Sequence, residues 1–297
     1  MAIKNVVVVG MTDRTSPSIV NGLVTSPHGY TVSVLSRESS QYKPPAGVQQ
    51  LKTDYTYDSL VSVLKGQDAV VSTIAGTALL EQKKIIDAAI TAGVQRFIPS
   101  EFGSDTSNPL ALDYFPAWGE KVEVRKYLES KQDQIQWTAV YNGLFFDWGL
   151  KVGFISVNAK EKTALIYPKY KDVAWSATNL ADVGTAVAQA LSPGIAAKTA
   201  NQILRIRTVT VSQSELLAAL EELVGSKFTV TEEDLDAQFQ DAKEKLSKGD
   251  FSGVGKLITR AIVDPRTGNN FDEAGNVSNG LLELATGDLK QTLTALL

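Results

Sequence analysis

The stretch that decides the fold reads IKNVVVVG over residues 3–10 and continues as MTDRTS over residues 11–16. A run of four valines that ends at a glycine is typical of a strand buried on both faces of a parallel sheet. Beyond the turn, apolar residues recur at helical spacing at Ile19, Val20 and Leu23. A strand, a tight turn and a helix in succession indicate the opening unit of a dinucleotide-binding fold.

The composition is that of an ordinary globular protein, and it excludes several kinds of chemistry. The chain has 297 residues and a formal net charge of -4, and no basic block favours nucleic acid or an anionic membrane. It has no cysteine, which excludes disulfides and thiolate nucleophiles, and its one histidine, His28, argues against a metal site or a Ser-His-Asp triad. No apolar run approaches the roughly 20 residues of a membrane span, and no signal peptide is recognisable. We therefore expect a cytoplasmic protein with a small-molecule substrate, no metal, and an oligomeric state that the sequence does not indicate.

Strands and helices alternate over the first 150 residues, which predicts an α/β fold with a doubly wound parallel sheet of the Rossmann type. The further strands are expected at residues 30–35, 47–51, 68–73, 94–98 and 136–141. The helices between them are expected at residues 59–64, 79–92 and 118–128. Ligands of such sheets bind at the carboxyl ends of the strands. We expect the site at residues 10–16, Arg37, 73–76 and 99–103, with the polar loop 104–116 as one wall.

The pattern changes near residue 150, where short strands begin to mix with helices. We divide the chain into an NADP-binding Rossmann domain over residues 1–150 and a smaller mixed α/β substrate lobe over residues 151–297. In the lobe, strands are expected at 163–167 and 202–207, helices at 180–191, 212–224, 231–245 and 251–262, and helix or coil at 274–297. Ser212 and Glu215 have the spacing of a capping box. Segments such as 178–207 are expected to pack back on the first sheet.

The end of the second strand carries the signal for the cofactor. Ser36 and Arg37 stand about 20 residues after the first turn, where an acidic residue would bind a ribose 2′-hydroxyl and an arginine accommodates a 2′-phosphate. Arg37 therefore favours NADP(H), and the alternative is a solvated arginine at a strand end. Small residues at Ala75 and Gly76 would let a flat cofactor ring lie close to the backbone.

An aromatic run, Phe145-Phe146-Asp147-Trp148, follows Asn142 and Gly143 after the sixth strand. Such a run can line an apolar substrate pocket. Packing in the core below the sheet is an equally good interpretation.

These landmarks together resemble the isoflavone-reductase-like (NmrA-like) branch of the atypical short-chain dehydrogenases/reductases, and the resemblance covers nearly the whole chain. Its most specific part is the block RFIPSEFG over residues 96–103. The weaker matches are Gly10-x-Thr12, Ser36-Arg37, the stretch 64–72, Glu120-Lys121, Asn142-Gly143-x-Phe145 and Asp182-Val183-Gly184.

The resemblance implies a Rossmann domain that binds NADPH, and a lysine, here Lys121, at the start of the helix after the Ser-Glu-Phe-Gly loop. An ammonium there can donate a proton, stabilise a developing anion or bind the nicotinamide ribose. The alternative is a surface lysine on an exposed helical turn. The predicted cofactor contacts are Gly10, Thr12, Asp13, Arg14, Thr15, Arg37, Thr73, Ala75, Gly76, Ser100, Glu101, Phe102, Lys121 and Asn142. The predicted substrate contacts are Phe102, Gly103, Phe145 and Phe146.

The first turn departs from the family pattern, which has glycine at the positions of Asp13 and Ser16. Glycine there lets the backbone approach the pyrophosphate. A carboxylate would repel it, since two unit charges about 4 Å apart repel by roughly 4 kcal/mol at an effective dielectric constant of about 20. Arg14, Thr12, Thr15 and the helix amino terminus can offset this repulsion, or Asp13 can cap the helix.

Three functions are compatible with these residues. The favoured one is an NADPH-dependent reductase of a small aromatic or polyketide-like metabolite, with Lys121 as the proton donor or anion stabiliser. The second is an NADP-sensing regulator that binds a protein partner without turnover. The third is a non-redox enzyme, such as an isomerase or cyclase, that lost the cofactor through Asp13 and Ser16.

Overall fold

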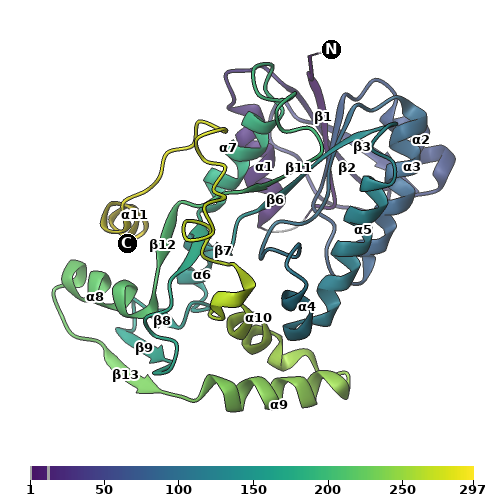
Figure 1. Cartoon of the computed structure of the whole chain (residues 1–297). Helices are drawn as coiled ribbons and strands as arrows, with labels where there is room; N and C mark the ends of the chain where they lie inside the picture. Colours follow the sequence, from purple (N-terminus) through teal and green to yellow (C-terminus); the bar gives the residue numbers. More distant parts are fainter. Residues whose placement is uncertain (1, 12–13) are drawn as a thin grey trace.

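The computed structural model describes residues 2–11 and 14–297, and its larger part is built on one parallel sheet (Figure 1). The strand order is β11 (Gln202–Arg205), β6 (Gln136–Tyr141), β5 (Arg96–Ile98), β4 (Ala69–Ser72), β1 (Asn5–Val9), β2 (Thr31–Arg37) and β3 (Gln49–Thr53). Every neighbouring pair in this sheet is parallel. The order reverses beside β1, as in Rossmann folds, so the predicted fold class is confirmed.

The valine run of β1 supplies a side chain to each face of this sheet in turn. Val6 and Val8 belong to the apolar core on one face, and Val7 and Val9 belong to the core on the other. All four side chains are fully buried. The sheet is therefore covered on both faces, which explains why β1 reads as a continuous apolar run.

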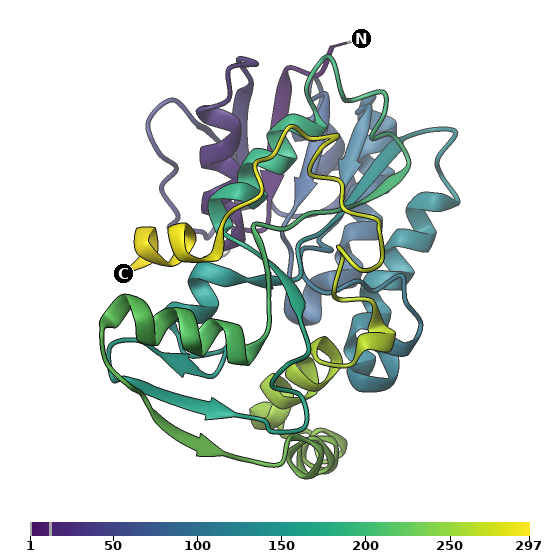
Figure 2. The ribbon, with the colours of Figure 1, turned by 60° about the vertical axis from the view of Figure 1, so that its left-hand side comes forward.

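Helices cover both faces of the large sheet (Figures 1 and 2). One face carries α1 (Thr15–Val24) and α7 (Leu180–Ala190), and the other carries α2 (Tyr57–Leu64), the 3-10 turn η1 (Gly76–Glu81), α3 (Gln82–Ala92) and α5 (Gly119–Glu129). The helices α1 and α7 cross so closely that a Cβ on Gly184 would lie 2.1 Å from the carbonyl oxygen of Ser18. Thus α7 and β11 lie on the large sheet, while the proposed boundary at residue 150 stays a prediction.

The smaller part contains two three-stranded sheets and the remaining helices. The sheets are β12 (Val209–Val211), β10 (Trp175–Thr178) and β7 (Leu144–Phe145), and β13 (Thr229–Glu232), β9 (Thr163–Ile166) and β8 (Val157–Asn158). The helices are α6 (Phe146–Lys151), α8 (Gln213–Val224), α9 (Leu235–Ser247), α10 (Val254–Ile262) and α11 (Leu289–Leu296). The short helix α4 (Leu110–Tyr114) lies within the loop 104–116, and 3-10 turns lie at Pro116–Trp118, Phe251–Gly253 and Pro265–Thr267.

The helix predicted over residues 231–245 was wrong at its start. Residues up to Glu232 form β13, which pairs in parallel with β9, because the β-branched residues there suit a strand. The helix α9 begins at Leu235, where the Asp234 side chain accepts hydrogen bonds from the amides of Asp236 (2.8 Å) and Ala237 (3.2 Å). The capping box of Ser212 and Glu215, by contrast, is confirmed.

Candidate functional site

A cavity of about 740 Å³ opens at the carboxyl ends of β1, β2, β3 and β4. It is lined by Gly10, Met11, Leu35, Ser36, Arg37, Glu38, Ser39, Ser40, Thr53, Asp54, Tyr55, Thr73, Ile74, Ala75, Ala78 and Glu81. Its volume lies in the usual range for small-molecule sites, roughly 300–1,000 Å³. The sequence analysis did not single out Thr53, Asp54 and Tyr55, although their position after a neighbouring parallel strand was a usable signal.

Gly10 fixes how the first turn lies against the fourth strand. Its φ is +82°, and a Cβ there would lie 2.8 Å from the backbone nitrogen of Ile74. Both the backbone conformation and the lack of space require glycine at this position. The turn therefore lies directly against the chain that follows β4.

Ser16 stands where the family has glycine, and the structure shows what its hydroxyl does. The side chain is fully buried, and its Oγ donates to the carbonyl of Gly10 at 3.3 Å. The Thr73 hydroxyl lies 3.1 Å from the same Oγ and donates to the carbonyl of Val9 at 3.0 Å. Ser16 therefore ties the turn to β4 and is not among the residues that line the cavity. The predicted contacts Thr12 and Asp13 lie outside the described residues.

Arg14 lies immediately before α1, and its guanidinium stacks over the ring of Trp148 at 4.2 Å. The sequence analysis placed Trp148 in an aromatic run but missed this contact, because it joins two parts of the chain 134 positions apart. Thr15 is the first residue of α1. A cation held at the amino terminus of a helix adds to a site that already favours anions.

Arg37 is exposed at the end of β2, on the wall of the cavity beside Ser39 and Ser40. No hydrogen bond or ion pair joins its guanidinium to residues 2–11 or 14–297. Glu38 lines the same cavity and is also exposed. The charge of Arg37 is thus left for a ligand, with hydroxyl groups next to it.

Lys121 lies in the first turn of α5, near the end of β5. Its half-buried side chain donates from Nζ to the backbone carbonyl of Glu101 at 2.7 Å. A Cβ built on Gly103 would lie 3.9 Å from this Nζ, so the two predicted residues are neighbours. Burial lowers the pKa of Lys121 below its usual value, and the charge of Glu101 partly opposes this shift.

The Glu101 side chain is buried inside the protein and is not among the residues that line the cavity. It is 1% exposed, accepts a hydrogen bond from the Thr106 hydroxyl at 2.9 Å, and lies 3.5 Å from Nε of Arg125. Thr106 also lies 3.0 Å from the hydroxyl of Tyr141. Burial raises the pKa of the Glu101 carboxyl. Arg125 was missed, although it follows Lys121 by four residues and so lies on the same side of the helix.

The other predicted residues on the loops after β5 and β6 are held by the protein itself. The backbone amide of Ser100 donates to Oε1 of Gln82 at 2.9 Å, and Phe102 is nearly buried. Asn142 is fully buried, and its backbone amide and that of Gly143 both donate to the carbonyl of Gly103 at 3.1 Å. These contacts join the two loops beside Lys121.

The two phenylalanines predicted to contact substrate differ in their surroundings. Phe145 is half-buried and packs at the edge of the core next to β1. Phe146 is fully buried in the core of the smaller part, so the structure does not bring it to a cavity, and core packing describes its position. Gly76 is exposed at the start of η1, next to Ala75 of the cavity wall.

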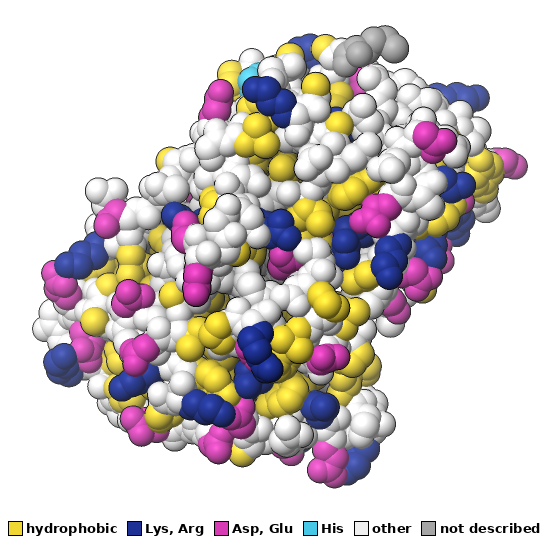
Figure 3. All heavy atoms as spheres, in the orientation of Figure 1, with side chains coloured by type: hydrophobic (Ala, Val, Ile, Leu, Met, Phe, Trp, Pro, Cys, Tyr) yellow, Lys and Arg dark blue, Asp and Glu magenta, His cyan; other side chains and the backbone are white. Residues whose placement is uncertain are grey.

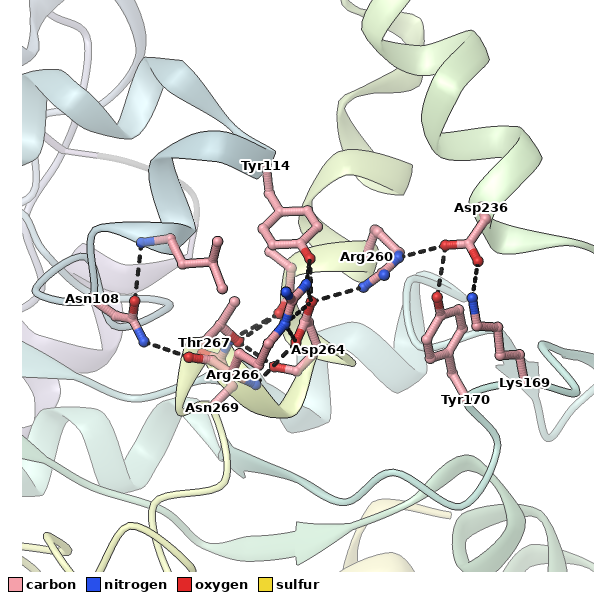
Figure 4. Close-up of polar contacts among 12 residues, drawn as sticks. Asn108, Tyr114, Lys169, Tyr170, Asp236, Arg260, Asp264, Arg266, Thr267 and Asn269 are labelled. Atoms are coloured by element: carbon pink, nitrogen blue, oxygen red, sulfur yellow. Dashed lines mark hydrogen bonds and ion pairs between the residues drawn. The ribbon is translucent and has the colours of Figure 1, made fainter.

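The loop 104–116 is fastened to the smaller part by a polar network (Figure 4). The Arg260 guanidinium lies over the rings of Tyr114 (5.3 Å) and Tyr170 (4.5 Å) and donates to Asp236 at 2.7 Å. The Tyr114 hydroxyl donates to the buried carboxylate of Asp264. Because Tyr114 belongs to α4 and its partners Arg260 and Asp264 lie in or just after α10, this loop joins the two parts of the molecule.

The surface shows no dominant patch of one charge on the face drawn in Figure 3, where basic and acidic side chains alternate. In residues 2–11 and 14–297, no helix has both the length and the apolar character needed to cross a bilayer.

Comparisons with known proteins place the chain in a family. The NmrA-like family matches residues 2–269. The oxidoreductase aprR of Aspergillus flavus is 37% identical over 301 residues, covering 100% of this chain and 99% of that protein. A phenylcoumaran benzylic ether reductase of Pyrus communis is 30% identical over 244 residues, covering 74% of this chain and 76% of that protein.

Solved structures show the same fold. The crystal structure of isoflavone reductase has a TM-score of 0.79 at 20% identity and covers 100% of both chains. The binary complex of leucoanthocyanidin reductase with NADPH from Vitis vinifera has a TM-score of 0.78 at 18% identity and covers 98% of this chain and 99% of that chain. The chain therefore belongs to the NmrA-like family and is an oxidoreductase of its isoflavone-reductase-like branch.

Proposed function

We propose that the protein is an NADPH-dependent reductase of a small aromatic or polyketide-like metabolite. The observation that carries this proposal is the exposed guanidinium of Arg37, which lines a cavity at the strand ends and has no partner within residues 2–11 and 14–297. An arginine at this position accommodates the 2′-phosphate of NADP(H).

The residues around the cavity fit a phosphorylated dinucleotide. Arg37, Ser39 and Ser40 offer one cation and two hydroxyl groups to a 2′-phosphate. The amino terminus of α1 and the guanidinium of Arg14 offer positive charge to a pyrophosphate. Bound NADPH would supply a hydride to the substrate.

Lys121 is the group that we assign to proton donation. Its burial favours the neutral amine, so the ammonium gives up a proton more readily than a solvated lysine does. The carbonyl of Glu101 holds its Nζ, and Gly103 leaves the space beside it free of a side chain. Phe102 and Phe145 are the aromatic residues of the adjoining loops that we assign to the substrate. The reductase names of the relatives support an aromatic substrate.

The test is a fluorescence titration of the purified chain with NADPH and with NADH. We expect NADPH to bind at submillimolar concentration and about tenfold more tightly than NADH, which corresponds to about 1.4 kcal/mol. In Arg37→Gln this preference should disappear, whereas Lys43→Gln, which changes an exposed lysine that is not among the cavity-lining residues, should keep it.

Three outcomes would contradict parts of the proposal. No binding at millimolar NADPH would favour the non-redox enzyme. Equal affinity for NADPH and NADH would remove the assigned role of Arg37. Tight NADPH binding without oxidation of the cofactor by any of a panel of aromatic ketones, quinones and phenylpropanoids would favour the sensor.

A further inference from the structure

The smaller part contains a second hollow, of about 580 Å³, between the sheet β13–β9–β8 and helix α10. It is lined by Gly153, Phe154, Ser156, Val157, Asn158, Thr163, Ala164, Leu165, Tyr167, Thr229, Thr231, Gly255, Lys256 and Thr259. None of these residues lines the cavity at the ends of β1–β4. We call it the lobe hollow.

Strands β8, β9 and β13 form one side of the lobe hollow. Thr163 pairs with Thr229, and Leu165 pairs with Thr231, so these side chains lie on the same face. On β9, Ala164 and Ile166 are buried in the core of the smaller part, whereas Val230, the β13 partner of Ala164, is exposed. The sheet thus contributes three threonines, Thr163, Thr229 and Thr231, to the lining of the hollow, together with apolar residues such as Leu165.

Lys256 is the only charged residue among those that line the lobe hollow. Its Nζ donates to the hydroxyl of Tyr167 at 2.7 Å and lies 5.3 Å from the centre of the same ring. Among the described residues no carboxylate pairs with it. Tyr167 is only 1% exposed, so the phenol is held at the base of the hollow. A half-buried ammonium whose one partner is neutral favours an anion next to it.

Acidic residues gather in a different hollow of the smaller part. A neighbouring hollow that shares Tyr167 is lined by Glu232, Glu233, Asp234 and Asp236. Asp236 accepts from Lys169, Tyr170 and Arg260, as Figure 4 shows, and Asp234 caps α9. The neighbouring hollow thus has four acidic residues beside one lysine, Lys169, whereas the lobe hollow is lined by a lysine and no carboxylate.

An aromatic residue of the lobe hollow is connected to the first turn of the fold through ring contacts. Phe154 lines the hollow, and its ring lies 5.8 Å from that of Trp148, which carries the guanidinium of Arg14. Ser156, also in the lining, has a φ of +65°, a left-handed conformation that costs free energy for a residue other than glycine. Such strained residues gather at ligand sites.

We propose that the lobe hollow binds a small aromatic carboxylate. Lys256 and Tyr167 hold the carboxylate, since the ammonium has further N–H groups and the phenol can donate its own hydrogen. Phe154 packs against the aromatic ring, and the threonines of β9 and β13 face the hydroxyl groups of the ligand. This site does not depend on the proposed reductase activity, because its residues are separate from the cofactor cavity.

The test is calorimetric titration of the full chain with 4-hydroxycinnamate and with the neutral 4-hydroxycinnamyl alcohol. We expect the acid to bind about tenfold more tightly than the alcohol, because only the acid can accept a charge-assisted hydrogen bond from Lys256. Lys256→Met should remove that difference and leave the affinity for the alcohol unchanged. The control Lys248→Met, at the exposed carboxyl end of α9, should bind as the wild type does.

Two further variants keep the test decisive. Tyr167→Phe removes one hydroxyl and should weaken binding of the acid about threefold even if Lys256→Met folds poorly. Arg37→Gln should not change binding of the acid. Equal affinities for acid and alcohol, or acid binding undiminished in Lys256→Met, would overturn the proposal. Loss of acid binding in Arg37→Gln would do so as well, because it would place the anion in the cofactor cavity.

Discussion

The ends of β2 and β5 lie on the same edge of one sheet, yet the charged side chains there differ in exposure and pairing. Arg37 at the end of β2 is exposed and has no partner within residues 2–11 and 14–297. Glu101 beyond β5 is 1% exposed and is held by Thr106 and Arg125. The charge at the first end is therefore accessible to a ligand, whereas the charge at the second end is paired inside the protein.

This difference has a physical consequence for the two loops. A solvated guanidinium costs little to leave unpaired and gains most when a phosphate arrives. A buried carboxylate must be paired within the protein, so it cannot also be a ligand for an incoming molecule. From the sequence, Glu101 was predicted to contact the cofactor. We infer that its buried carboxylate instead affects the pKa of Lys121 from inside the protein.

The variant Lys121→Met tests this contrast most strongly, because it has the largest expected effect. If Lys121 is the general acid, kcat should fall by about 10²–10⁴-fold, the usual contribution of such a group. The affinity for NADPH should change less than threefold, because the Arg37 end is untouched. Steady-state rates of NADPH oxidation and the fluorescence titration measure the two quantities.

The matched control for this prediction is Lys126→Met, which changes an exposed lysine on the last turn of the same helix. Its kcat should stay within a factor of two of the wild type. If Lys121→Met lost NADPH affinity as strongly as it lost turnover, Lys121 would be a cofactor ligand and the contrast between the two ends would fail.

Glu101→Gln sharpens the comparison by removing charge while keeping shape. Glu101 raises the pKa of Lys121 against the lowering effect of burial. Without the carboxylate the pKa of Lys121 should fall further, so the protonated lysine is lost at a lower pH. The alkaline limb of kcat should therefore move to lower pH, which a pH–rate profile measures.

Glu129→Gln provides the comparison for that profile. Glu129 also lies near Arg125, at 3.6 Å from Nη1, but its side chain is 42% exposed, whereas that of Glu101 is buried. Its profile should match that of the wild type. An unmoved limb in Glu101→Gln would mean that the limb reports another group.

The contrast also explains how much could be read from the sequence. The doubly wound parallel sheet and the place of Arg37 follow from local patterns, a buried valine run and a fixed spacing to the second strand, and both expectations agree with the structure. The burial of Glu101 could not be predicted from the sequence, because it depends on tertiary contacts with Thr106 and Arg125. The stacking of Arg14 on Trp148 likewise arises only when two distant segments meet.

Position 16 is where the family pattern and this chain differ within the described residues, and it gives the smallest expected effect. From the sequence, Ser16 was expected to hinder cofactor binding, and glycine at this position was expected to restore it. The structure shows a buried hydroxyl that bonds to Gly10 and lies next to Thr73, away from the cavity lining. Ser16→Ala should therefore lower the free energy of unfolding by about 1 kcal/mol, the net value of one hydrogen bond, as measured by urea titration.

The companion variant Ser16→Gly separates the two interpretations. If the hydroxyl is a tie between β1 and β4, glycine should destabilise the chain by about 1 kcal/mol more than alanine, because it also loosens the first turn of α1, and NADPH affinity should stay within threefold. Ser18→Ala, on the same helix but without the tie, should change neither quantity. Tenfold tighter NADPH binding in Ser16→Gly would show that the serine obstructs the cofactor, since the loss of a structural hydrogen bond does not by itself improve affinity.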